Sequence, residues 1–386
     1  MCVISNQYQL SDIDVKVNTL DTMQTLKTTW LNVQMRSHSN AFLSWAWVES
    51  LCAIQPGQYH ILTAECDNKV VGIGIVFIKH VVLLKIFKIK QAYLHRYGQQ
   101  ELDQVWVEYN DFMVEKNASP IIKEAMLNYV FEHKLADEFM IGMSSEQALQ
   151  PYSLVHANVR CIMESPGYQA NLEHCDSLDD YFKTLSRNTR SQINRTRKLL
   201  EKEGQIHLAE ALSVSQKHAY LKEISEIHKQ RWNDSTYGSG FSNHHFVDFH
   251  QRLNSDRFEQ SVTKIFELKL DTKILGFVYL LVQEDKWLFY LSALNYHPDK
   301  RVKIGLLFHS LVIEKAISEG IKHYDFLAGE ARYKQSMSNT EPYIQKLVCF
   351  YSDRFILRFM QRLRKSKLWI NIHIISCIFP KKMMSP

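Results

Sequence analysis

Lys264–Ala293 reads KIFELKLDTKILGFVYLLVQEDKWLFYLSA. Three apolar runs rich in β-branched and aromatic residues are separated here by short polar turns, a pattern that predicts consecutive antiparallel strands. The predicted strands are Lys264–Leu270, Leu275–Val282 and Trp287–Ala293. Gly305 then begins an apolar helix that ends near Ser318, and His323–Leu327 reads as one more strand.

Helical patterns precede these strands. Ser177 and Asp180 form a possible capping box, and a basic helix is predicted from Asn188 to Glu203. A further helix is predicted at Ala219–Trp232, before a loop rich in Ser, Asn and Gly at Asn233–Asn243. The order of helices, three strands, crossover helix and strand indicates a mixed α/β domain.

The N-terminal half contains similar elements without a repeat in the sequence. Tyr59–Glu65 and Val70–Ile78 read as a hairpin, Val81–Phe87 and Tyr93–Tyr97 as further strand material, and Pro120–His133 as a helix. We therefore predict two α/β domains with mostly antiparallel sheets flanked by helices. The predicted divisions are an N-terminal domain at 1–166, a C-terminal domain at 167–350 and a basic tail at 351–386.

The composition is that of a globular protein. Of the 386 residues, 46% are hydrophobic and 23% are charged, close to the averages for folded soluble domains. The first residues lack a secretory pattern, so a cytoplasmic location is expected. The seven cysteines are scattered without a C-x-x-C pair. His244, His245 and His250 are not spaced from Cys or carboxylate residues as metal ligands are. We therefore predict no metal.

Positive charge gathers at the C-terminus. From Gln345 onward there are nine Lys or Arg and one Asp, so the first 344 residues hold 37 basic and 40 acidic residues. The apolar run Leu368–Phe379 has twelve residues, whereas spanning a bilayer takes about 20. The tail therefore suits interfacial attachment to anionic lipid at the inner face of the membrane. A helix packed on its own domain is the alternative.

Positive charge also lies where the helix at Gly305 begins. Backbone N–H groups at a helix N-terminus bind anions, and glycine lets a phosphate approach closely. The predicted pyrophosphate-binding residues, suited to coenzyme A, are Arg301, Lys303, Ile304, Gly305, Leu306 and Leu307. An ordinary turn from strand to helix is the alternative.

These motifs resemble those of a known family. Ile304–Leu307, a helix ending at Gly320, and the run YDFLAGEARYK at Tyr324–Lys334 look like the C-terminal signature of the CelD-like, cellulose-biosynthesis-associated GNAT acetyltransferases. Ser186–Arg190 and His228–Trp232 are also similar to that family. The resemblance implies two tandem GNAT-like domains and an acyl-CoA, such as acetyl-CoA, as co-substrate.

The resemblance also implies catalytic residues. Glu330 would act as general base on the acceptor ammonium, with Asp325 as a second choice, and Tyr333 would protonate the leaving thiolate. Lys334 would hold an acceptor phosphate or carboxylate. Backbone N–H groups of Trp287–Ala293 would polarise the thioester carbonyl. A structural ion pair of Asp325, Glu330 and Lys334 at a turn is the alternative.

Further residues are candidates for acceptor binding. Arg187, Arg190 and Arg197 form one stripe along the basic helix, suited to an anionic acceptor or else simply a solvated face. Trp232 is the last residue of the segment His228–Trp232 that is similar to the CelD-like family. Glu108 and Asp111 lie in a short polar segment that would either contact the acceptor or form an ordinary loop.

The predicted activity is transfer of an acyl group, as an N-acetyltransferase would perform, to an amino group of a cell-envelope or polysaccharide precursor. Two alternatives remain open. Fem-type transferases, which are also tandem GNAT proteins, use aminoacyl-tRNA, and that donor would be the only nucleic-acid partner expected. A non-catalytic scaffold that binds a membrane synthase through the tail is the other.

Overall fold

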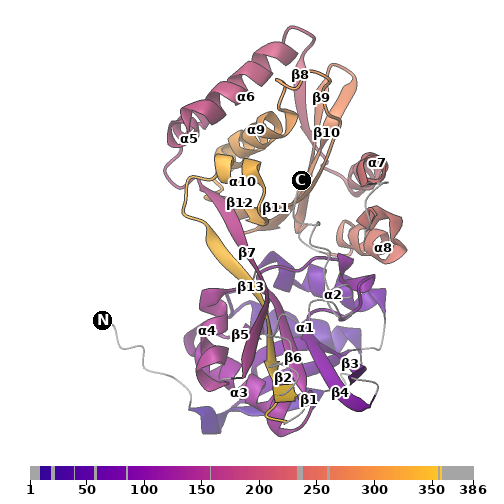
Figure 1. The fold of residues 1–386 in the computed structure, drawn as a ribbon, viewed down its shortest axis with the longest axis vertical. Coiled ribbons are helices and arrows are strands. Elements are labelled where there is room, and N and C mark those ends of the chain that lie inside the picture. The colour runs from indigo at the N-terminus through magenta and orange to yellow at the C-terminus, as the bar shows by residue number, and fades with distance from the viewer. Residues whose placement is uncertain are drawn as a thin grey trace. The chain divides into compact units, whose positions relative to one another are not determined.

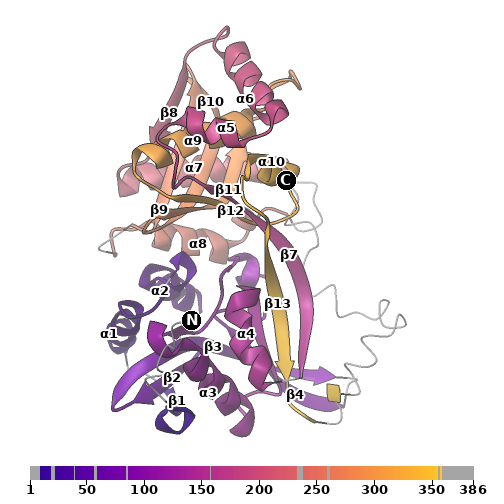
Figure 2. The ribbon, with the colours of Figure 1, turned by 90° about the vertical axis from the view of Figure 1, so that its left-hand side faces the viewer.

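The computed structural model describes residues 9–18, 22–38, 40–55, 59–83, 86–156, 158–232, 238–258, 261–354 and 357–358. The chain divides into two compact units. Unit 1 contains the described residues up to Glu164 and those from Ile344 to Arg358, whereas unit 2 contains Ser165–Tyr343. Figures 1 and 2 show the helices and strands of each unit.

Unit 1 is built on a mostly antiparallel sheet whose strand order is β1-β2-β3-β4-β6-β13, with β5 paired to β3. Its strands are β1 (Asp14–Asn18), β2 (His60–Cys66), β3 (Lys69–Leu83), β4 (Phe87–Leu94), β5 (Met113–Val114), β6 (Glu138–Ser145) and β13 (Tyr343–Tyr351). Its helices are α1 (Met23–Gln34), α2 (Trp45–Ile54), α3 (Ser119–Glu132) and α4 (Glu146–Val155). The pair β4 and β6 is parallel.

A close approach of helix and strand holds the core of unit 1 together. A Cβ atom at Gly72 of β3 would lie 2.6 Å from Ile122 Cγ2 of α3, so only glycine allows this distance. Ile122, Met126 and Val130 of α3 are fully buried against the sheet. The predicted hairpin is confirmed, but β3 is one strand from Lys69 to Leu83 rather than two, because its pairing with β4 extends its length.

Unit 2 has the strand order β7-β12-β11-β10-β9-β8. Its strands are β7 (Val159–Asn171), which begins in unit 1, β8 (Ile206–Glu210), β9 (Thr263–Leu270), β10 (Lys273–Gln283), β11 (Lys286–Leu294) and β12 (His323–Ala328). Its helices are α5 (Leu178–Thr184), α6 (Arg187–Leu200), α7 (Val214–Trp232), α8 (His244–Leu253), α9 (Ile304–Ser318) and α10 (Arg332–Met337). Short 3₁₀ turns in the two units lie at Leu10–Asp12, Ala41–Leu43, Leu102–Gln104, Lys116–Ala118 and Gly240–Ser242.

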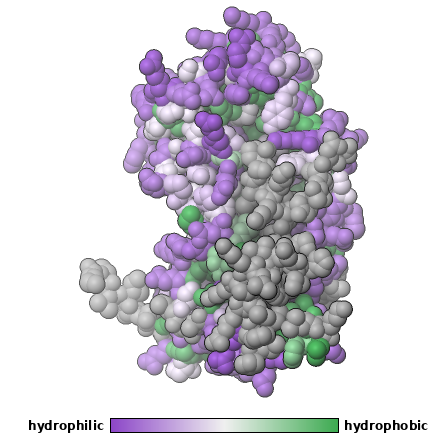
Figure 3. All heavy atoms as spheres, in the orientation of Figure 1, coloured by the Kyte–Doolittle hydropathy of each residue, from purple (hydrophilic) through white to green (hydrophobic). Residues whose placement is uncertain are grey.

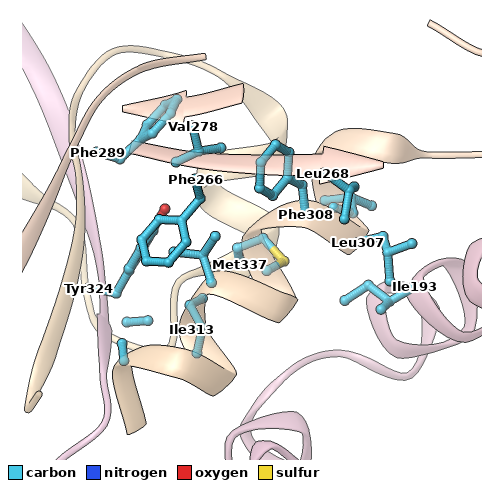
Figure 4. Close-up of a cluster of buried hydrophobic side chains, with 14 of the residues drawn as sticks. Ile193, Phe266, Leu268, Val278, Phe289, Leu307, Phe308, Ile313, Tyr324 and Met337 are labelled. Carbon is cyan, nitrogen blue, oxygen red and sulfur yellow. The ribbon is translucent and has the colours of Figure 1, made fainter. Parts of the chain in front are cut away.

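The main core of unit 2 lies between the sheet and α9. Phe308 and Ile313 of α9 pack with Phe266 and Val278 of the central strands, and Ile193 of α6 packs against the outer side of α9 (Figure 4). Helices α7 and α8 cover the opposite face of the sheet (Figure 1). The sheet is therefore enclosed on both faces, which explains the continuous apolar runs of its strands.

The two units repeat the same order of elements. The series β1-α1-α2-β2-β3-β4-α3-β6-α4-β7 corresponds, type by type, to β8-α7-α8-β9-β10-β11-α9-β12-α10-β13, with the short β5 as an addition. The last strand of each series pairs outside its own series, because β7 pairs with β12 and β13 with β6. Residues 344–350, assigned from the sequence to the C-terminal domain, therefore lie in the sheet of unit 1. The predicted fold class of tandem α/β domains is confirmed.

Part of the predicted tail lies outside the described residues, namely 355–356 and 359–386. Within the ranges that are described, no helix is both long enough and apolar enough to cross a membrane.

Candidate active site

An opening between two parallel strands marks the candidate site in unit 2. Strands β11 and β12 pair over three positions, of which Leu288 opposite Asp325 is the last. A bulge follows in β11, because Tyr290 is an extra residue between Phe289, which pairs with Leu280, and Leu291, which pairs with Tyr279. Such bulges bend a strand. Beyond Leu288, β11 has no strand partner on its β12 side among the described residues.

Aromatic rings line the opening. The Tyr333 ring of α10 lies 6.4 Å from the rings of both Phe289 on β11 and Phe326 on β12, measured between centroids. His309 of α9 stacks on Tyr333 at 5.5 Å, and its Nδ1 lies 2.9 Å from the Tyr324 hydroxyl. Burial lowers the pKa of His309 to about 3, so the imidazole is neutral. Tyr333 is thus held rigidly where the strands separate.

The surroundings of Tyr333 keep its hydroxyl protonated. Burial raises its pKa well above the ordinary value, Tyr296 adds to this effect and Arg231 opposes it. The Arg231 guanidinium lies 5.0 Å from the centre of the exposed Tyr296 ring and 5.4 Å from that of Trp232. The structure therefore brings a cation and two aromatic rings near Tyr333. Sequence reasoning selected Trp232 and missed Arg231 and Tyr296, although Arg231 stands in the same His228–Trp232 motif.

Asp325 holds the irregular end of β12. Its side chain is fully buried, and its Oδ1 accepts hydrogen bonds from Leu327 N at 2.8 Å and from the Tyr343 hydroxyl at 2.6 Å. Leu327 has a φ of 61°, a left-handed conformation that costs energy in a residue other than glycine. The hydrogen bond from Leu327 N offsets part of this cost. Asp325 therefore stabilises the turn that positions the residues after β12.

Glu330 and Lys334 follow this turn and have different surroundings. Glu330 is exposed, and its carboxylate has no hydrogen-bond partner within the described residues. Lys334 donates a hydrogen bond of 2.7 Å to the Ala328 carbonyl at the end of β12. The structure thus places Asp325, Glu330, Tyr333 and Lys334 at one end of β12, with the carboxylate of Glu330 open to water.

The N-terminus of α9 has free backbone donors. Lys303 N donates to Thr196 Oγ1 at 2.9 Å, which fixes α6 against the start of α9. The N–H groups of Ile304, Gly305 and Leu306 have no hydrogen-bond partner within the described residues, and no side chain caps the helix. The side chains of Ile304, Leu306 and Leu307 are buried, so these predicted residues can meet an anion only through their backbone.

The basic side chains around α9 are not equivalent. Arg301 is exposed and donates to both carboxylate oxygens of Asp299, from Nε to Oδ1 at 3.1 Å and from Nη2 to Oδ2 at 2.7 Å. It lowers the pKa of Asp299 to about 2. Its charge is therefore already matched. Lys303 is exposed at the first position before α9.

The arginine stripe lies on α6. Thr189, Ile193, Thr196 and Leu200 form the buried side of this helix, whereas Arg187 is exposed and Arg190 and Arg197 are half-buried. Arg190 Nη1 donates weakly to the Phe182 carbonyl at 3.4 Å. Arg197 borders an open groove of about 450 Å³ between α6, β8 and Leu311 of α9.

The corresponding opening in unit 1 is occupied by the chain itself. Strands β4 and β6 also pair over three positions, and the last pair is Tyr93 opposite Met140. Beyond this pair Asn110 bridges the two strands, because Asn110 N donates to Met143 O at 3.3 Å and Asn110 Nδ2 donates to Leu94 O at 2.7 Å. In unit 1 the chain itself thus joins the two strands beyond the end of their ladder.

The two unit 1 carboxylates predicted to bind an acceptor are engaged in similar internal bonds. Glu108 is buried and accepts a hydrogen bond of 2.8 Å from Gln345 Nε2. Asp111 accepts hydrogen bonds from Lys123 and Tyr152, and burial raises its pKa above the ordinary value. In the described ranges of either unit, no three His, Cys, Asp or Glu residues gather as a metal site requires.

Comparisons with known proteins show which folds and domains this chain resembles. Residues 187–335, which run from α6 into α10, match the family model described as an acetyltransferase (GNAT) domain. The fold resembles that of FemX, with 11% sequence identity, a TM-score of 0.58, and coverage of 90% of this chain and 100% of that one. It also resembles L-PGS from Bacillus licheniformis, with 11% identity, a TM-score of 0.52, and coverage of 89% and 96%. A conserved protein of unknown function from Bacteroides thetaiotaomicron is similar at 11% identity and a TM-score of 0.54, with coverage of 88% and 100%.

No curated protein matches the sequence. The family model covers the whole opening, the start of α9 and the residues after β12. Residues 187–335 thus resemble a GNAT acetyltransferase domain, and the chain as a whole shares the fold of FemX and L-PGS.

Proposed function

We propose that this protein is an N-acyltransferase that moves an acyl group, such as acetyl, from coenzyme A to an amino group. The observation that supports the proposal is the start of α9, where three backbone N–H groups have no partner among the described residues and which lies beside the strand that opens. A Cβ atom added at Gly305 would come within 3.3 Å of Leu294 Cδ1 at the end of β11. A pyrophosphate on the free amides of α9 would therefore place the rest of the donor along β11.

The residues around the opening supply the chemistry. Backbone N–H groups of β11 beyond Leu288 polarise the thioester carbonyl. Glu330 takes a proton from the acceptor ammonium through water, since its carboxylate is exposed. The amine forms a C–N bond as the C–S bond breaks, and Tyr333 gives its proton to the leaving thiolate. The raised pKa of Tyr333 keeps that proton in place until then.

The acceptor side follows from the remaining charges. Arg231, together with Tyr296 and Trp232, offers a cation and two ring faces near Tyr333. Such a group binds a planar or sugar ring that carries an anionic substituent. This chemistry fits the amino-sugar precursors of a polysaccharide or of the cell envelope, in keeping with the resemblance to CelD-like proteins. The α6 arginines would bind further phosphates.

The donor is tested by isothermal titration of the intact protein with acetyl-CoA. We expect micromolar binding, and Gly305→Asp should abolish it because the carboxylate repels the pyrophosphate. Gly305→Ala is the matched comparison, since it adds the same Cβ without the charge and should weaken binding less than Gly305→Asp does. Circular dichroism should be the same for both variants. Equal affinity of Gly305→Asp and the unaltered protein would remove the donor assignment from α9.

The alternatives give different results in the same experiment. A Fem-like transferase would show no heat with acetyl-CoA but would retain aminoacyl-tRNA on a filter. The similarity of fold to FemX over 90% of this chain is the observation that keeps this donor in consideration. A non-catalytic scaffold would bind neither donor, and changes at Glu330 and Tyr333 would leave its cellular role intact.

A further inference from the structure

The outer half of the β3–β4 hairpin in unit 1 is basic and apolar without any acidic residue. Lys79–Lys90 reads KHVVLLKIFKIK, with four lysines, one histidine and no Asp or Glu. The described residues 79–83 and 86–90 form a two-stranded ribbon, since the β3–β4 register continues out to Leu83 opposite Phe87, beyond the pairing of β4 with β6. Figure 1 labels both strands at the lower right of the view.

The two faces of this ribbon differ. Paired residues of an antiparallel ladder point to the same face. One face carries Val81 and Ile89, followed by Leu83 and Phe87, and Leu83 and Ile89 are buried. The other face carries two exposed pairs. These are His80 opposite Lys90 and Val82 opposite Lys88.

Large apolar side chains are exposed at the tip. Ile86 is 75% exposed, Val82 54% and Phe87 38%, within six residues of one another. Figure 3 shows hydrophobic surface beside hydrophilic residues at the lower right, where Figure 1 labels β3 and β4. A cluster of exposed apolar residues surrounded by lysines indicates an interaction surface rather than ordinary scatter.

The basic tail leaves unit 1 beside this hairpin. Leu357 is fully buried in a small cluster with Leu83 and Ile89, and Arg354 just before it pairs with Asp137 at 2.6 Å. The 28 residues after Arg358 contain six Lys or Arg and no acidic residue. Two separate basic and apolar segments of the chain therefore start from the same place on unit 1.

We infer that the β3–β4 hairpin is a membrane-docking element that inserts Ile86 and Phe87 into the interface of an anionic lipid bilayer. Lys88 and Lys90 stand behind the tip at the level of the headgroups, where each cation near an anionic surface strengthens binding. The apolar tip adds binding that salt does not screen. The hairpin and the tail act together, since single weak anchors give only marginal attachment. This inference is independent of the reaction that the protein catalyses.

The test is sedimentation of the intact protein with vesicles of phosphatidylcholine and phosphatidylglycerol at low salt. Ile86→Asp should lower the partition coefficient at least tenfold, since it replaces an inserted apolar side chain with a charge repelled by the lipid. Met35→Asp is the matched control, because Met35 is also 75% exposed on unit 1, just after α1. It should bind as the unaltered protein does. Ile86 is exposed, so both variants should keep their melting temperature.

The electrostatic part has its own pair of variants. Lys88→Glu should weaken binding by an order of magnitude or more at low salt and less at high salt, whereas Lys222→Glu on α7 should have no effect.

Three outcomes would overturn the inference. The intact protein could fail to sediment with these vesicles, or Ile86→Asp could bind as well as Met35→Asp, which would leave attachment to the tail alone. Ile86→Asp could also change only the mass measured by light scattering, which would make the tip a contact between copies of the chain.

Discussion

Asp325 and Glu330 are five residues apart and have opposite surroundings. Asp325 is fully buried and accepts two hydrogen bonds from the protein, whereas Glu330 is exposed. A general base must reach the proton that it abstracts, and a carboxylate already bonded to Leu327 N and Tyr343 is poorly suited to that role. These contacts support Glu330 as the base and a structural role for Asp325.

Glu330→Gln should slow turnover by about 100-fold or more while leaving the affinity for acetyl-CoA unchanged, because the amide cannot accept the proton. Turnover is measured from the release of free thiol. Glu341→Gln, another exposed carboxylate of unit 2, serves as the control and should keep full activity. If Glu330→Gln is as active as the control, the base is a different group, and His228 would be examined next.

At the scale of elements, both parts of the proposed site depend on how a strand or helix ends. At the start of α9 three amides have no partner in the part of the chain that the structure describes, and β12 ends in a turn that places Glu330, Tyr333 and Lys334 together. The turn contains the strained Leu327, and the buried Asp325 carboxylate is what satisfies its N–H group. The stability of unit 2 should therefore depend on Asp325.

Asp325→Ala should lower the free energy of unfolding by about 2 to 4 kcal/mol, since the Leu327 N–H and the Tyr343 hydroxyl would both lose their acceptor in a buried place. Tyr343→Phe removes one of these donors and should cost about 1 kcal/mol. Urea denaturation measures both. An Asp325→Ala protein that is as stable as the unaltered one but inactive would instead assign Asp325 to catalysis.

At the scale of the whole molecule, each unit buries neutral histidines. Burial lowers the pKa of His95 in unit 1 to about 4 and that of His250 in unit 2 to about 3, below the ordinary 6.5. Between pH 6.5 and these values the unfolded chain binds more protons than the folded one. The contribution of each buried neutral histidine to the free energy of unfolding is therefore complete above pH 6.5 and is lost as the pH falls.

Stability should accordingly fall as the pH is lowered from 6.5 to 5, by about 1 to 2 kcal/mol for each such histidine. Urea denaturation at a series of pH values measures the slope. His250→Phe should reduce the slope of unit 2 unfolding by about 1.4 kcal/mol per pH unit, and exposed His207→Phe should not change it. If the free energy of unfolding has the same slope with pH in His250→Phe and in His207→Phe, His250 is not neutral in the folded protein.

The sequence by itself determined the local elements and the class of fold. Alternation of apolar residues and turn chemistry marked β9, β10 and β11 to within two residues, and helix periodicity marked α6 and α9, because these signals come from neighbours along the chain. The motif Tyr324–Lys334 also placed Glu330, Tyr333 and Lys334 at one strand end, since they are close in sequence.

Only the tertiary structure decided which strands pair and which opening is free. The pairing of β13 with β6, and the contact of Tyr109 N with Gln345, join residues about 200 or more positions apart, and no local pattern encodes such partners. Arg231 and Tyr296 likewise meet only because α7 packs against β11. Asn110 fills the opening in unit 1, whereas the start of α9 lies beside the opening in unit 2. This difference depends on packing between residues that are distant in sequence and adjacent in space.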